Sequence, residues 1–171
     1  LSSYTSGTAS DRAGTLSGSP DVTYVTAKDT MTQVLAVTAF SASATVKAGE
    51  IITITGRNRL NLSTRETMLD ATGAAIIFAG TVTEDVTLDG SGAGNLTIAG
   101  PAIYEANGQY NTTATAATSG DVVTLLGAAS TLYQPNMFYH EQAFGVGTVK
   151  LPKLYSTDTV ATTHDGMSIR V

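Results

Sequence analysis

Short apolar runs rich in β-branched residues, each bounded by a turn, set the main constraint on the fold of this chain. The most apolar run is Ile51-Ile52-Thr53-Ile54, and the turn-forming Lys47-Ala48-Gly49-Glu50 stands directly before it. Thr, Ala, Gly and Val are abundant, whereas Leu, Glu and Lys are sparse. This composition disfavours long helices and favours short strands joined by Gly-containing turns. The sequence therefore predicts a mainly β fold.

Antiparallel strands are predicted between Asp21 and Gln134, at residues 22–25, 33–40, 51–54, 76–78, 86–88, 96–99 and 122–126. The apolar period changes after Arg57, where Ser63 and Glu66 have capping-box spacing, so a short helix is predicted from Thr64 to Leu69. Strands of this kind with one accessory helix form a small closed or nearly closed β-barrel, which leaves few exposed strand edges.

The barrel is expected to occupy residues 21–134 and to fold autonomously. Residues 1–20 are rich in Ser, Thr and Gly, and alone they cannot offset the entropy of their ordering. They are assigned to an enclosing domain, as is the return segment 135–171, which begins at Pro135. Ser168-Ile169-Arg170-Val171 resembles a strand without a partner, and Leu1 stands in place of an initiator Met. We therefore expect a piece of a longer protein.

The charge balance restricts the classes of partner. The chain of 171 residues carries a net charge of −5, only 13% of its residues are charged, and it has no Cys. A weakly charged acidic surface is unsuited to binding phosphate backbones, so no specific nucleic-acid binding is expected. No apolar run approaches the roughly 20 residues that a membrane-spanning helix needs, so no membrane partner is expected.

The residues that could carry chemistry lack the required spacing. His140 and His164 each stand beside a carboxylate, and neither their adjacency nor a set with Asp158 or Asp165 matches a relay or a metal site. The Gly-rich stretch 90–95 has no Lys-Ser/Thr after it and no helix start, so it is predicted to be a hairpin loop. We expect no enzymatic activity, cofactor or metal.

The turns contain two sets of charged residues and one glycine with a predicted role in folding. The first hairpin is expected to have a charged tip at Lys28 and Asp29, and a second charged set is formed by Arg57, Arg59, Arg65 and Glu66. Solvation of exposed turns explains such charges when they are taken one by one. Gly49 is predicted to be critical for folding, because the turn before the most apolar strand requires a positive φ.

Several segments in the same order resemble the major capsid (coat) protein of short-tailed enterobacterial phages. The C-terminal part carries Pro-Asn-Met-Phe-Tyr-His-Glu-Gln-Ala-Phe from Pro135, Leu-Pro-Lys-Leu from Leu151, and Asp-Gly-Met-Ser-Ile-Arg-Val from Asp165. The stretch from Val46 to Ile54 and Gly-Pro-Ala-Ile-Tyr from Gly100 resemble the insertion domain of that family. The resemblance implies a barrel at 21–134 inserted into a Johnson-type (Hong Kong phage-type) capsid fold, of which only flanking segments are present.

The function implied by this resemblance is structural. Copies of the subunit would assemble into an icosahedral shell around the genome, and scaffolding protein and portal would be further partners. The protein would assemble in the host cytoplasm and reside in the virion, and the inserted domain would aid subunit folding. In this family a projecting loop of the insertion domain contacts the neighbouring capsomer, which by position implies that role for Lys28 and Asp29.

Two other functions remain open at this point. A β-sandwich binding module of a phage tail fibre or bacterial adhesin has a similar usage of Thr, Gly and Ala. A fragment of an enzyme that uses His140 or His164 is the other alternative. An internal repeat would favour the adhesin, and the sequence contains none that we recognise.

Overall fold

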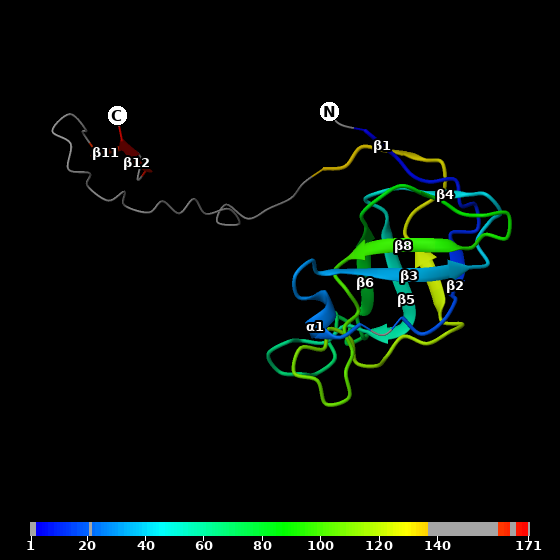
Figure 1. Cartoon of the computed structure of the whole chain (residues 1–171), viewed down its shortest axis with the longest axis horizontal. Helices are drawn as coiled ribbons and strands as arrows, with labels where there is room; N and C mark the ends of the chain where they lie inside the picture. The colour runs from blue at the N-terminus through cyan, green and yellow to red at the C-terminus, as the bar shows by residue number, and fades with distance from the viewer. Residues whose placement is uncertain (1–2, 21, 137–160, 165–166, 171) are drawn as a thin grey trace. The chain divides into compact units, whose positions relative to one another are not determined.

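The computed structural model in Figure 1 describes residues 3–20, 22–136, 161–164 and 167–170. The chain divides into two compact units, Leu1–Pro135 and Asn136–Val171. In the second unit β11 (Ala161–His164) pairs antiparallel with β12 (Met167–Arg170). The first unit contains the barrel.

The first unit is built on a closed barrel of antiparallel strands in the order β2-β3-β8-β6-β5-β9. These strands are β2 (Ala13–Leu16), β3 (Thr32–Thr38), β8 (Gly94–Ala99), β6 (Ile77–Val82), β5 (Ile51–Asn58) and β9 (Val122–Leu125). Strand β2 closes the barrel, because Thr15 pairs with Thr38 of β3 on one side and with Val122 of β9 on the other. The prediction of a mainly β fold with a small antiparallel barrel is confirmed.

The barrel interior is filled by aliphatic side chains from alternate positions of the strands. In β3, Leu35 and Val37 are buried while Val34 between them is 54% exposed. Every strand contributes to this core, whose fully buried members include Leu16, Leu35, Ile52, Ile54, Val82, Leu96, Ile98, Val123 and Leu125. Each such side chain stabilises the fold by about 1.5–3 kcal/mol relative to exposure, which makes the core the main source of stability.

The predicted boundary at residue 21 does not coincide with the edge of the barrel. Residues 13–16, assigned by their composition to an enclosing domain, form strand β2 of the barrel. Gly14 faces inward beneath Phe40, and a Cβ there would lie 2.4 Å from the Phe40 ring. The bulk that β2 lacks is therefore supplied by Phe40, which is why a count of apolar residues in β2 misses the strand.

The first predicted strand is wrong, because residues Tyr24–Ala27 form the short helix α1. Thr23 caps this helix by accepting a hydrogen bond on Oγ1 from the Thr26 amide at 3.3 Å. Lys28 is its C-cap, and its amide donates to the Tyr24 carbonyl at 2.9 Å. Lys28 and Asp29 thus follow a helix and do not form a hairpin tip; a capping threonine outweighed the β-branched pattern.

The predicted helix from Thr64 to Leu69 is also wrong. Asn61 Oδ1 accepts hydrogen bonds from the amides of Ser63 at 2.8 Å and Thr64 at 3.3 Å, and Arg65 has a φ of 65°. A side chain that bonds the following amides competes with helix formation, and a left-handed residue ends it. The segment is a folded-back loop with isolated bridges at Leu60–Thr67 and Leu69–Ala75.

Two short ribbons complete the first unit. Strand β4 (Thr45–Val46) pairs with β7 (Val86–Thr87), and β1 (Tyr4–Thr5) pairs with β10 (Leu132–Tyr133). Among the described residues, no helix is long and apolar enough to cross a membrane.

Candidate functional site

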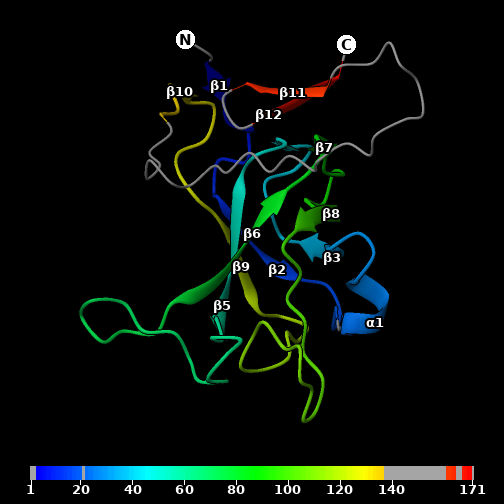
Figure 2. The same ribbon diagram turned by 90° about the vertical axis from the view of Figure 1, so that its left-hand side faces the viewer.

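The barrel has two ends of different character, which Figure 2 shows at the top and the bottom of the view. The stem end comprises residues 4–12, 47–51 and 126–133, and it includes the β1–β10 ribbon. The loop end comprises residues 23–31, 59–76 and 100–121, and it includes α1. The chain enters and leaves the first unit at the stem end.

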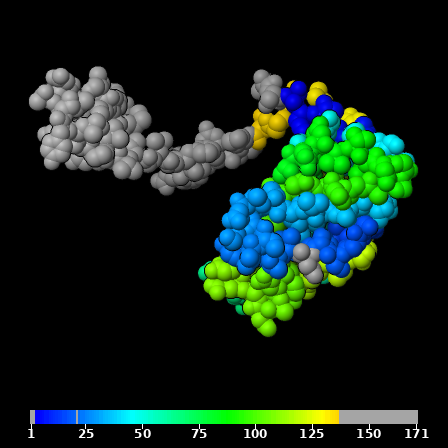
Figure 3. Space-filling view, in the orientation of Figure 1, coloured from blue at the N-terminus to red at the C-terminus, as the bar shows by residue number. Residues whose placement is uncertain are grey.

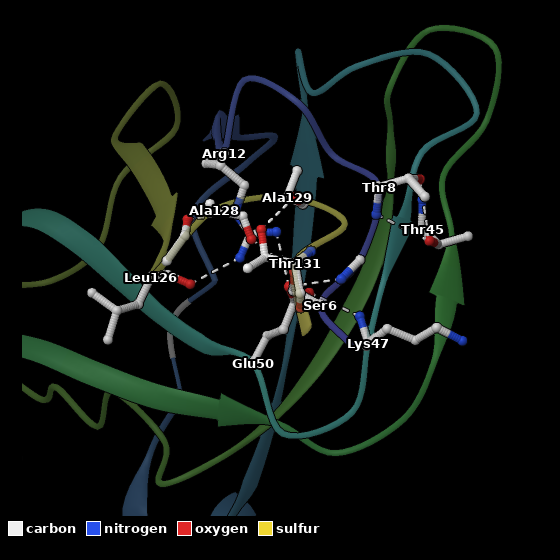
Figure 4. Close-up of polar contacts among 12 residues, drawn as sticks. Ser6, Thr8, Arg12, Thr45, Lys47, Glu50, Leu126, Ala128, Ala129 and Thr131 are labelled. Carbon is white, nitrogen blue, oxygen red and sulfur yellow. Dashed lines mark hydrogen bonds and ion pairs between the residues drawn. The ribbon is translucent and has the colours of Figure 1, made fainter. Parts of the chain in front are cut away.

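The two ends of the first unit are held side by side at the stem. Tyr4 pairs with Tyr133 and Thr5 with Leu132 in the β1–β10 ribbon. Ser6 extends the pairing, because its Oγ donates to the Ala128 carbonyl at 2.7 Å and accepts from the Thr131 amide at 2.9 Å (Figure 4). Residues more than 120 positions apart therefore form one small structure at the base of the barrel.

A buried ion pair joins two segments of the stem end, residues 4–12 and 47–51. Arg12 Nη1 lies 2.8 Å from Glu50 Oε1, and the two side chains are 11% and 2% exposed. Arg12 also donates from Nε to the Gly127 carbonyl at 3.1 Å and from Nη2 to the Leu126 carbonyl at 2.9 Å. The guanidinium therefore fastens residue 12, the strand that follows Glu50 and the segment after β9 to one another (Figure 4).

The Glu50 carboxylate is fully engaged by donors. In addition to the ion pair with Arg12, Oε1 accepts a hydrogen bond from the Gly7 amide at 3.0 Å, and Oε2 accepts one from the Lys47 amide at 2.9 Å. A buried carboxylate is tolerated only when it is paired and hydrogen-bonded in this way. Removal of either charged partner would leave the other uncompensated inside the protein.

The Lys47–Glu50 turn has the predicted conformation. Gly49 has a φ of +90°, its amide donates to the Val82 carbonyl at 2.8 Å, and the Glu50 amide donates to the Lys47 carbonyl at 3.2 Å. A Cβ at Gly49 would meet the Tyr4 ring at 3.7 Å, which is an ordinary contact. The backbone conformation, and not crowding, therefore makes glycine the favoured residue at this position.

The pKa values of Tyr4 and Asp85 are shifted by the groups around them. Burial, followed by the negative charges of Glu50 and Asp85, raises the pKa of the Tyr4 hydroxyl. That hydroxyl is buried and has no hydrogen-bond partner among the described residues. Hydrogen bonds from Lys47 Nζ at 2.6 Å and from the Ala48 amide at 2.8 Å lower the pKa of Asp85, which lies outside the turn.

The loop end is organised by a second ion pair. Arg57 Nε and Nη2 donate to the two carboxylate oxygens of Asp121, each at 2.8 Å, and Nη1 donates to Thr115 Oγ1 at 2.8 Å. The Arg57 hydrogen bond is the main cause that lowers the pKa of Asp121, and the same bond raises the pKa of Arg57. The pair fastens loop 100–121 to β5, with side chains 17% and 14% exposed.

The other charged residues of the loop end differ in their contacts. Arg65 donates to the carbonyls of Gly108 and Asn111, which joins loop 59–76 to loop 100–121. Lys28 Nζ lies 3.4 Å from Asp29 Oδ1, and the two side chains are 47% and 83% exposed. Lys28 and Asp29 thus remain at the surface, whereas Arg57 and Arg65 hold the loops in place.

Aromatic and aliphatic side chains surround a hollow of about 510 Å³ at this end. The rings of Tyr24 and Tyr110 are stacked with centroids 4.2 Å apart, so α1 packs on loop 100–121. Figure 3 shows the blue atoms of the α1 region directly above the yellow-green atoms of that loop. The lining residues are Tyr24, Met31, Leu62, Ser63, Arg65, Ile103, Gln109, Tyr110 and Thr112.

Two other candidate sites were considered from the sequence, the Gly-rich stretch 90–95 and the histidines with their neighbouring carboxylates. Asp89 Oδ1 accepts hydrogen bonds from the amides of Ser91 at 2.7 Å and Ala93 at 2.9 Å, so residues 90–93 form a loop, whereas Gly94 and Asn95 of the predicted loop are the first residues of β8. Among the described side chains, no three of His, Cys, Asp or Glu gather as metal ligands. His140, Asp158 and Asp165 and the side chain of His164 lie outside the described residues.

Arg12 and Glu50 were missed at the sequence level, although each carries a local signal. Arg12 is a charged residue in a segment of small polar residues, and Glu50 stands between a turn glycine and the most apolar strand. A charge directly beside a buried strand requires a partner. The sequence does not reveal which residue that is, because strands β2, β3 and β4 lie between Arg12 and Glu50 in the chain.

Comparison with known proteins places the chain among phage coat proteins. The family model described as "P22 coat protein - gene protein 5" matches residues 2–171. The major capsid protein of Acyrthosiphon pisum secondary endosymbiont phage 1 is 35% identical over 164 residues, which cover 94% of this chain. The chain spans 38% of the length of that relative. The chain therefore belongs to the P22 coat protein family.

Proposed function

We propose that the chain is part of the structural subunit of an icosahedral tailed-phage capsid, and that its first unit is a barrel inserted into an enclosing capsid domain. The observation that carries this proposal is the β1–β10 ribbon, which holds both ends of the barrel together. A domain whose ends are adjacent can be inserted into a host fold with little disturbance. Family membership and the similarity to a major capsid protein support the role.

The proposed role is mechanical and involves no catalysis. Copies of the subunit pack by contacts that are repeated by symmetry, and each contact is weak enough for errors to be corrected. Scaffolding protein and portal are the proposed additional partners. Assembly takes place in the host cytoplasm, and the product resides in the virion. The inserted barrel supports subunit folding because it buries its own core.

Electron microscopy of the longer protein tests this proposal. The longer protein is produced together with its scaffolding protein and imaged in negative stain. We expect closed shells of uniform diameter. Fibres, or a monomer that does not assemble at any concentration tested, would contradict the capsid role and favour the tail-fibre or adhesin alternative.

We further propose that Lys28 and Asp29 contact a neighbouring subunit. Both are exposed beside the loop-end hollow, and the one ion pair that each forms among the described residues is with the other. Replacing both by Ala is expected to change the free energy of unfolding by no more than about 0.5 kcal/mol, because exposed pairs contribute little. Shell yield is expected to fall.

A matched control separates a contact from a general surface effect. Ser17 and Ser19 are exposed just after β2, where the Gly18 amide donates to Ser119 Oγ, and the double variant Ser17→Ala, Ser19→Ala should assemble normally. Shell yield is measured by sedimentation for both double variants. Normal shells from the Lys28→Ala, Asp29→Ala protein would remove these two residues from the interface.

A further inference from the structure

The stem end carries an apolar surface that the barrel itself does not cover. Ile51 is 39% exposed, Leu126 is 64% exposed and Tyr133 is 37% exposed, although each is a large apolar side chain. They surround a hollow of about 210 Å³ whose full lining is Tyr4, Ser6, Gly49, Glu50, Ile51, Leu126, Gly127 and Tyr133. An exposed apolar hollow of this kind is typical of an interaction site.

Hydrogen bonds hold part of the wall of this hollow in place. Its walls include the β1–β10 ribbon, and the Tyr133 hydroxyl accepts a hydrogen bond from the Ala128 amide at 2.7 Å, which holds that ring in place. Gly49 and Gly127 are among its lining residues, so a bound group can approach the backbone closely there. An engineered cavity of about 150 Å³ holds benzene, so this hollow has room for one aromatic or large aliphatic side chain.

The location of the hollow indicates its occupant. It lies beside the ribbon through which both chain segments leave the barrel, and the relative that this chain matches is far longer, with 38% of its length covered. We propose that the hollow receives one apolar side chain from a part of the enclosing domain that lies outside these 171 residues of the same polypeptide, so that the barrel is docked at its stem and does not swing on two linkers. This inference rests on the proposed insertion into a capsid subunit.

Docking at the stem has a mechanical consequence. The stem is joined to the barrel by Arg12 and Glu50, whose side chains are almost completely buried. A barrel that is fixed at the stem presents its loop end in one direction, which lowers the entropy lost when Lys28 and Asp29 meet a neighbour. Two flexible linkers would leave that orientation undefined.

Hydrogen exchange in the unassembled longer protein and in the 171-residue chain tests the proposal. The probes are the Leu126 and Ala128 amides, whose hydrogen bonds go to the Ile51 carbonyl and the Tyr133 hydroxyl. We expect these amides to exchange about tenfold more slowly in the longer protein, because the docked side chain covers them. Amides of loop 59–76 should exchange at equal rates in the two proteins.

Two variants make the test specific. Leu126→Asp places a charge at the rim of the hollow and should abolish the extra protection in the longer protein. Val25→Asp is the matched control, because Val25 is 69% exposed at the loop end, and it should retain the protection. Both variants should melt like the parent in the 171-residue chain, since both side chains are exposed.

Three results would overturn the docking proposal. One is equal exchange at Leu126 and Ala128 in the two parent proteins, which means that the hollow stays in water. Another is protection that rises with protein concentration, which identifies a second copy as the occupant. The third is loss of protection in both variants. Normal shells with an unprotected stem would refute docking alone, whereas absence of shells would refute the capsid role.

Discussion

The two ends of the barrel each contain an arginine paired with a carboxylate, but the pairs differ in what surrounds them. At the stem, Arg12 and Glu50 are bonded to backbone carbonyls and amides of three segments, and the carboxylate is 2% exposed. At the loop end, Arg57 and Asp121 are bonded mainly to each other and to threonine hydroxyls, and both side chains are more exposed.

The two pairs should therefore act on different properties: the stem pair on the folding of the barrel, and the loop-end pair on the position of a surface loop. The stem pair connects the start of β2 with the start of β5 and the end of β9. Its removal should therefore weaken the pairing of β2, which closes the barrel. The loop-end pair fixes a loop that lies outside the barrel core. Substitutions at the stem should therefore reduce the stability of the whole barrel, whereas most substitutions at the loop end should leave it folded.

Removal of the N-terminal segment should have the largest effect. A chain of residues 21–134 lacks β2 and Arg12. The edges of β3 and β9 that pair with β2 would therefore be open, and Glu50 would have no counter-charge. We expect no cooperative thermal transition from this fragment, whereas residues 3–135 should melt in a single transition. Circular dichroism during heating compares the two. A cooperative melt of the shorter fragment at the same temperature would show that β2 is dispensable.

The two arginines should differ when each is replaced by Ala. Arg12→Ala leaves the Glu50 carboxylate buried without its charge partner, which should cost about 3–5 kcal/mol. Arg57→Ala removes charge-assisted hydrogen bonds in a less buried place and should cost about 1–3 kcal/mol. Urea unfolding of both variants measures the difference. Equal costs would contradict the distinction drawn between the two ends.

A substitution in the stem turn should destabilise the barrel less than the loss of Arg12 does. Gly49→Val forces a β-branched residue to a φ of +90°, which should cost about 1–2 kcal/mol. The opened turn would expose the apolar strand that follows, so the variant should aggregate during expression at high temperature. Soluble yield at two temperatures measures this. Gly73→Val at the loop end, with a φ of +85°, is the control for backbone strain alone.

The loop-end pair should produce a small, pH-dependent effect. The pKa of Asp121 is lower in the folded protein than its ordinary value, chiefly because of Arg57. The pair therefore stabilises the fold fully above about pH 3.9, and this contribution is lost as the pH falls through the folded pKa. Asp121→Asn should reduce stability at neutral pH and make the loss of stability below about pH 4 less steep. An unchanged acid profile would exclude this contribution.

The strands with a distinct apolar run between turns were predictable from sequence. The second predicted strand corresponds to β3, and those at 51–54 and 96–99 correspond to β5 and β8. Strand β2 was not predictable, because Phe40 from another segment supplies the bulk that Gly14 lacks. The helix at Tyr24 depends on one threonine cap, which a β-branched run conceals.

The candidate site was predictable only where it is local. The Gly49 turn needs no distant partner, so its positive φ follows from the residues around it. The Arg12–Glu50 pair and the Tyr4–Tyr133 contact join residues far apart in the chain, and their partners become apparent only when the barrel is closed. Lys28 and Asp29 were correctly placed at the surface but in the wrong element.

Native-state hydrogen exchange of the 171-residue chain tests most directly whether the N-terminal segment closes the barrel. The Leu16 amide donates to the Asp121 carbonyl, and the Leu125 amide donates to the Arg12 carbonyl, each across the β2–β9 seam. If β2 is an integral strand, both amides should open with the same free energy as the amides of β5, through global unfolding. Fast exchange at Leu16 and Leu125 while β5 remains protected would show that the barrel is closed without β2 and would contradict this account.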